Sequence, residues 1–256
     1  MLKQFVHRHK KRQSFKQREE RQKRIIIVFM VLFSFVCIII GELLLLRGIA
    51  TQNEKKIAEK KLEYFRSLPA GSDSKQFYDF LKKNKEYEQQ YQLLLKESKR
   101  FPLKKEELDQ ITYVDSWGGE RNYGGKRRHE GCDLMSETNK RGELPIFSMS
   151  DGVLENKGWL TLGGYRLGIK TESGIYYYYA HLYSYADGLK VGDKIKAGQF
   201  LGFMGDSGYG EEGTTGQFPV HLHLGIYFKN EKEELSINPY WILKEVEERE
   251  RSKIAP

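Results

Sequence analysis

The chain has 256 residues, of which 30% are charged and 39% are hydrophobic, and it carries a formal net charge of +8 at pH 7. Residues 1–24 contain ten Lys or Arg against two acids, so this short segment accounts for the whole excess and the rest of the chain is neutral. A duplex-binding protein needs a basic face on the folded domain itself, so we expect no nucleic-acid partner.

An apolar segment follows the basic tail. Residues 25–41 contain no charged side chain, and the apolar run continues after Glu42 to Leu46. About 20 residues cross the hydrocarbon core of a bilayer, and Lys and Arg mark the cytoplasmic side. We therefore predict a cytoplasmic tail at residues 1–24, a single-pass anchor in the cell membrane at residues 25–46 and an extracytoplasmic remainder. A cleaved secretory signal is the alternative, but the basic region is long for one.

A polar, lysine-rich segment at residues 47–102 is predicted to form a helical stalk or linker. Proline and glycine at residues 69–71 interrupt it, and a helix is expected from about residue 74 to residue 99. Its apolar side chains recur near helical spacing: Phe77, Phe80, Leu81, Tyr87, Tyr91, Leu94 and Leu95. This stripe is too short to establish a coiled coil, so a homodimer through the stalk and an extracytoplasmic protein partner both remain open.

Residues 103–243 are predicted to form a mainly β, antiparallel domain, followed by a charged C-terminal tail at residues 244–256. Short alternating apolar segments separated by Gly and Asp indicate strands and turns. The expected strands are residues 146–155, 165–171, 175–182, 200–204 and 220–228.

The last expected strand places two histidines on one face. Side chains alternate along a strand, so His221 and His223 face one side while Leu222 and Leu224 face the other. The same rule places His181 on the face of Tyr177 and Tyr179, which are expected to line a groove around it.

A third histidine segment reads His129-Glu-Gly-Cys-Asp133. The glycine between His129 and Asp133 disfavours a helix interior and suits a turn that enters a strand. We interpret the intervening Cys132 as a small packed residue, and its distance in the chain from Cys37 argues against a disulfide.

These three segments contain every histidine beyond residue 9. Each motif alone is weak evidence, because paired or alternating polar residues often belong to a solvated surface. Together they supply neutral imidazoles and a carboxylate, and a catalytic zinc site uses three such ligands with a fourth position left for water. The sequence therefore predicts a zinc (Zn2+) site with two histidines to spare.

The motifs together resemble the zinc endopeptidases of the lysostaphin and LytM type, which cleave peptidoglycan. The resemblance runs from about Tyr113 to Tyr240. It includes the HxxxD and HxH motifs, the Tyr-Ala-His181-Leu segment, and the glycine-rich blocks at residues 191–199 and 202–208.

The resemblance implies that His129, Asp133 and His223 hold the zinc, while His181 and His221 stand beside the metal-bound water. Tyr123 falls where the family carries a tyrosine that steadies the oxyanion. A membrane-anchored zinc metalloendopeptidase that hydrolyses stem or cross-bridge peptides of peptidoglycan is the function implied. Which of His181 and His221 acts as general base stays open.

Two other functions remain as alternatives: a membrane-anchored scaffold of the sporulation engulfment type with little or no hydrolysis, and a regulator of another wall hydrolase. Scaffolds of this kind often lack a ligand, whereas this chain keeps all five expected positions.

Overall fold

The computed structural model describes residues 30, 33, 39–49, 52, 74–229 and 234–252. The chain divides into two compact units, Met1–Lys60 and Lys61–Pro256. In the first unit residues 39–49 are helical. Most of residues 25–46, where the anchor is predicted, lie outside the described residues. Within the described part of the chain, no helix combines the length and the apolar character needed to cross a membrane.

The second unit contains three α-helices and one 3-10 helix among its described residues: α2 (Ser74–Lys83), α3 (Lys85–Glu97), η1 (Lys105–Gln110) and α4 (Tyr240–Ser252). The short strands are β1 (Ile111–Thr112), β2 (Glu120–Arg121), β3 (Arg127–Arg128), β5 (Pro145–Phe147), β9 (Lys194–Ile195) and β12 (Glu234–Ile237). The longer strands are β4 (Cys132–Ser136), β6 (Gly152–Leu160), β7 (Gly164–Lys170), β8 (Ile175–Tyr185), β10 (Phe200–Met204) and β11 (His221–Lys229).

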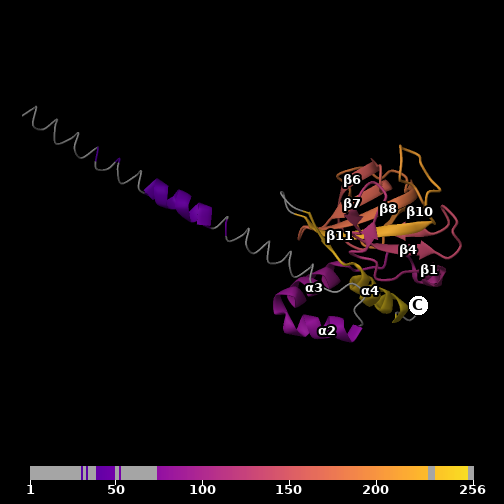
Figure 1. The fold of residues 1–256 in the computed structure, drawn as a ribbon, viewed down its shortest axis with the longest axis horizontal. Helices are drawn as coiled ribbons and strands as arrows, with labels where there is room; N and C mark the ends of the chain where they lie inside the picture. Colours follow the sequence, from indigo (N-terminus) through magenta and orange to yellow (C-terminus); the bar gives the residue numbers. More distant parts are fainter. Residues whose placement is uncertain are drawn as a thin grey trace, which may run out of the picture. The chain divides into compact units, whose positions relative to one another are not determined.

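A large antiparallel sheet dominates this unit (Figure 1). Its main strand order is β1-β4-β11-β8-β7-β6-β9, with β12 added at β11 and β10 joining β8 to β5. β2 and β3 form a separate hairpin before β4. The predicted mainly β, antiparallel fold is confirmed, and the pairing of β11 with both β4 and β8 brings distant segments of the chain together.

Strand β11 shows how the sequence pattern builds the core. Leu222, Leu224 and Ile226 are completely buried on one face, while His223 on the other face retains some exposure. The expected strands at residues 165–171, 175–182, 200–204 and 220–228 correspond to β7, β8, β10 and β11. The single strand expected at residues 146–155 is wrong: the chain turns at Ser148–Ser150, where the Met149 carbonyl accepts hydrogen bonds from Lys99 and Arg100.

The helices pack on the sheet as part of one core. Phe77 of α2 stacks on Trp241 of α4 with ring centroids 4.6 Å apart, and α2, α3 and α4 lie beside one another below the sheet in Figure 1. The helix expected over residues 74–99 is interrupted at Asn84, whose side chain donates to the Phe80 carbonyl. Residues 244–252, assigned from the sequence to a charged tail, continue α4 and bury Val246.

The helices contact the core face of β8. The Tyr177 hydroxyl lies 2.8 Å from the Ser98 hydroxyl after α3, and the Tyr179 hydroxyl accepts a hydrogen bond from the Met149 backbone N–H. Because side chains alternate along a strand, Tyr176 and Tyr178 face the opposite side, which is left for a cavity.

Candidate metal centre and its cavity

The pairing of β4 with β11 places Asp133 directly opposite His223. His129 lies in the segment before β4, where its backbone N–H and C=O bond to Gly119 and Gly118. This loop pairing turns the His129 side chain back over β4 and leaves it 2% exposed. Backbone hydrogen bonds between β4 and β11 therefore hold Asp133 and His223 side by side, although they are 90 positions apart in the sequence.

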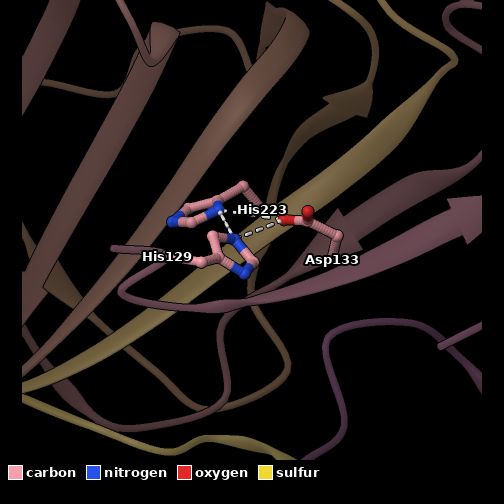
Figure 2. A group of neighbouring side chains, drawn as sticks. All are labelled: His129, Asp133 and His223. Atoms are coloured by element: carbon pink, nitrogen blue, oxygen red, sulfur yellow. Dashed lines mark hydrogen bonds and ion pairs between the residues drawn. The ribbon is translucent and has the colours of Figure 1, made fainter. Parts of the chain in front are cut away.

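The three side chains converge on a common point (Figure 2). His129 Nε2 lies 2.9 Å from His223 Nδ1, and each nitrogen lies 3.0 Å from Asp133 Oδ1. Atoms at this spacing can all contact one ion at about 2.0–2.2 Å, the bond length of zinc to imidazole nitrogen and carboxylate oxygen. The predicted ligand set therefore has the geometry of a shared metal site.

The protonation of these groups also fits a cation. His129 Nδ1 lies 2.9 Å from the Ser116 carbonyl oxygen and must donate its proton there, which leaves Nε2 as an electron-pair donor. Although burial alone would raise the pKa of the Asp133 carboxyl, its contacts with His129 and His223 lower that pKa well below the ordinary value. In the metal-free chain these contacts require a proton between the ring nitrogen and the carboxylate oxygen. A bound divalent ion would take the place of that proton.

Gly131 makes room for the His223 ring. A Cβ at this position would lie 2.6 Å from His223 Cε1 and 2.6 Å from the Leu224 carbonyl oxygen. The absence of a side chain at the centre of the HxxxD motif therefore lets the ring approach the backbone just before β4.

Arg121 of β2 holds the second oxygen of the ligand carboxylate. Its Nη2 lies 2.7 Å from Asp133 Oδ2, while Oδ1 faces the two imidazoles. Partners that orient a ligand from behind commonly change metal affinity 10- to 100-fold. Sequence reasoning missed Arg121, because only the β2–β3 hairpin brings it to Asp133.

His181 and His221 lie beside the three candidate ligands, with their ring centroids 4.7 Å apart. His181 Nδ1 lies 2.8 Å from the Ser207 carbonyl oxygen, and His221 Nδ1 lies 2.7 Å from that of Pro219. Each ring donates its Nδ1 proton to the backbone, so each neutral ring keeps an unprotonated Nε2. Burial lowers the pKa of both imidazoles and favours this neutral form.

A β-bulge explains how His181 reaches this face. Leu167 pairs with Tyr179 but Tyr165 pairs with Leu182, so Ala180 and His181 together oppose the single residue Arg166. His181 adopts a positive φ of 62°, and the extra residue reverses the alternation. The expectation that Tyr177 and Tyr179 line the groove is therefore wrong, since both are fully buried; Tyr176 and Tyr178 line it instead.

A cavity of about 980 Å³ contains the whole cluster. His129, Asp133, His181, His221 and His223 all line it. An aromatic side chain from the loop before β11, Phe218, packs on two of them: its ring centroid lies 4.5 Å from that of His181 and 5.1 Å from that of His221. The sequence did not single out Phe218, because its loop has no periodic pattern.

Tyr123 and Cys132 lie apart from the candidate ligands. The Tyr123 ring stacks on Tyr209 with centroids 4.1 Å apart, and its hydroxyl donates to the Tyr209 carbonyl. The catalytic role of Tyr123 stays a prediction. The Cys132 thiol is fully buried and points to the Val114 carbonyl, and burial raises its pKa. Cys132 pairs with Leu224 of β11 and is not among the three converging ligand atoms, so the interpretation of Cys132 as a packed residue agrees with its place in the fold.

The fold and this constellation have known counterparts. The sequence model of peptidase family M23 matches residues 127–239. The L-Ala–D-Glu endopeptidase of Bacillus subtilis is 44% identical over 129 residues, which is 50% of this chain and 38% of that protein. The glycyl-glycine endopeptidase ALE-1 of Staphylococcus capitis is 37% identical over 83 residues, 32% of this chain and 21% of that protein.

A solved structure extends the likeness to most of the chain. A LytM protein from Ruminococcus gnavus, provisionally assigned as a glycyl-glycine endopeptidase, is 50% identical with a TM-score of 0.58. The match covers 73% of this chain and 77% of that one. By contrast, this chain spans well under half the length of the curated relatives that it matches.

Proposed function

The chain belongs to peptidase family M23, and from that premise we propose that it is a zinc metalloendopeptidase that hydrolyses peptide bonds of bacterial peptidoglycan. One observation carries the proposal: three candidate ligand atoms lie 2.9–3.0 Å apart in the same cavity as two further imidazoles with unprotonated Nε2 atoms. In this proposal the first three hold an ion, one of the other two moves a proton, and the remaining imidazole stabilises negative charge.

Each group has a part in peptide hydrolysis. Zinc, when bound by His129, Asp133 and His223, polarises a carbonyl and lowers the pKa of a coordinated water to about 7. Nε2 of one neutral imidazole, His181 or His221, accepts a proton from the attacking water and returns it to the leaving amine. The other imidazole takes up a proton from solvent at Nε2, because negative charge developing on the carbonyl oxygen beside it favours the protonated ring, and it donates a hydrogen bond to that oxygen.

The relatives' names give two classes of bond. An L-Ala–D-Glu bond adjoins an acidic residue, whereas a glycyl-glycine bond lies in an uncharged segment. The proposed function covers both classes, because the candidate ligands and the two imidazoles act on the peptide group itself.

The direct test uses the purified full chain in detergent with purified peptidoglycan. We expect about one zinc per chain and the release of new amino groups without new reducing sugar ends, because the bond cleaved is a peptide. Chelation should stop this release and added zinc should restore it. A chain that holds one zinc and releases no amino groups from walls of several compositions would favour the scaffold alternative.

We also propose that residues 25–46 anchor the chain in the cell membrane, with residues 1–24 in the cytoplasm. The support is the basic cluster followed by an apolar run, together with the described helix at residues 39–49. Leu43, Leu44, Leu45 and Leu46 on this helix are 59–66% exposed. An apolar helix surface with this exposure favours a lipid environment.

Membrane fractionation tests the anchor. We expect the full chain to stay in the membrane pellet after alkaline carbonate extraction, and a chain starting at residue 52 to be released. Protease added outside intact cells should digest the catalytic unit and spare an epitope placed at the N-terminus. Digestion of that epitope, or extraction of the full chain by carbonate, would contradict the proposed topology.

A further inference from the structure

Four arginines line the cavity that contains the candidate metal centre: Arg121, Arg127, Arg128 and Arg166. Arg121 pairs with Asp133, and Arg127 donates to the Tyr123 carbonyl and the Tyr209 hydroxyl. Arg128 is exposed to solvent, which can satisfy its guanidinium. Three of the four guanidinium groups therefore have hydrogen-bond acceptors, which are protein groups for Arg121 and Arg127 and solvent for Arg128.

Arg166 differs from the other three. Its side chain is half-buried, and its Nη1 atom is shielded from solvent without a hydrogen-bond partner among the described residues. A buried charged donor without an acceptor is costly, and the side chain that carries it lines the cavity. An acceptor supplied by a ligand would remove that cost.

The position of Arg166 relates it to the reaction site. It lies on β7 directly opposite the Ala180–His181 bulge of β8, and Arg166 and His181 line the same cavity. Its own backbone N–H and C=O are both bound to the Tyr185 hydroxyl. That double contact fixes the main chain from which the side chain extends.

We propose that Arg166 is a specificity-determining residue that binds a carboxylate of the substrate next to the bond that is cut. The inference rests on the proposed function and narrows it to peptides with an acidic residue at that bond. A guanidinium offers two parallel N–H donors that match a carboxylate. An uncharged glycine segment has no group that would neutralise Arg166, so the acidic class is the preferred substrate.

The test compares two peptides that differ in one group. Both contain the L-Ala–D-Glu bond, with the D-Glu carboxylate free in one and converted to the neutral amide in the other, and pentaglycine serves as a third substrate. For the zinc-loaded full chain in detergent, we expect kcat/KM to favour the free carboxylate by at least about 10-fold, the strength of one charged hydrogen bond. Calorimetric binding of the two peptides to the metal-depleted chain should show the same preference without turnover.

Three variants make the test specific. Arg166→Gln should remove the preference, because it weakens binding and hydrolysis of the free-carboxylate peptide only. Arg166→Lys should keep part of the preference. Arg128→Gln removes one charge from the same cavity and should keep the full preference. Zinc content and the melting temperature should be unchanged in all three, which separates substrate recognition from damage to the fold.

Each outcome bears on one proposal. Binding that favours the carboxylate without any hydrolysis would overturn the proposed function and leave Arg166 as the carboxylate site. The role of Arg166 would be overturned if the acid and amide peptides were bound and hydrolysed equally well, or if pentaglycine were hydrolysed faster. It would also be overturned if Arg166→Gln lowered kcat/KM equally for both peptides. Failure of the free-carboxylate peptide to bind would overturn it too.

Discussion

Replacing His223 with alanine is expected to abolish stoichiometric zinc binding and, with it, hydrolysis of peptidoglycan. His223 Nδ1 lies within 3.0 Å of both other candidate ligand atoms, so its loss leaves a single imidazole and one carboxylate. Partners that only orient a ligand already cost 10- to 100-fold in metal affinity. Loss of a ligand itself should therefore weaken zinc binding by more than about 100-fold.

Zinc-dependent stability measures this loss independently of activity. A ligand present at 1,000 times its Kd stabilises the folded chain by about 4 kcal/mol, so zinc should raise the melting temperature of the wild-type chain and leave that of His223→Ala nearly unchanged. Without zinc the two chains should melt alike, because the variant removes a ring from a cavity wall and leaves the core face of β11 intact. Wild-type zinc content in His223→Ala would contradict the assignment of this ligand.

The histidine motifs identified the site because their spacing matches strand periodicity. Alternation in β11 correctly put His221 and His223 on the face opposite Leu222 and Leu224. The pairing of Asp133 with His223 could not be predicted, because strand order depends on contacts between segments about 90 residues apart. The resemblance to a known family supplied that information instead.

Local departures from periodicity explain what the sequence missed at the site. The bulge at Ala180–His181 adds one residue to β8, and no feature of the Tyr-rich segment marks where it falls. Arg121 and Arg166 gain their roles from the strands that happen to lie beside them, since neither belongs to a motif. Their importance becomes visible only when hydrogen bonds and burial are known.

Helical periodicity predicted an apolar stripe in the segment that forms α2 and α3, but not which part of the chain packs against it. The apolar spacing of Phe77, Leu81, Tyr91 and Leu94 predicted a stripe, and these side chains are indeed buried. The pattern does not say what covers a stripe. In the structure, α2 and α3 pack against α4, whose continuation beyond residue 243 was hidden because charged side chains dominate its sequence.

Replacing His181 or His221 with alanine is expected to leave zinc content unchanged and to lower kcat by about 10²- to 10⁴-fold, the usual contribution of a general acid or base. Neither ring belongs to the candidate ligand set, and each keeps its Nε2 free by donating Nδ1–H to a backbone carbonyl. Zinc content by mass spectrometry and turnover of a defined peptide would measure the two effects separately. A variant that loses zinc and activity in parallel would instead make that histidine a ligand.

Asparagine and glutamine replacements distinguish what each ring does. Asparagine keeps an N–H donor near the position of Nδ1, so recovery in His181→Asn would mean that the contact with Ser207 alone matters. Glutamine keeps a donor near the position of Nε2 but offers no base there. We therefore expect glutamine to restore part of the activity at the residue that donates to the oxyanion and none at the residue that takes the proton. Equal recovery at both positions would mean that neither imidazole is the base.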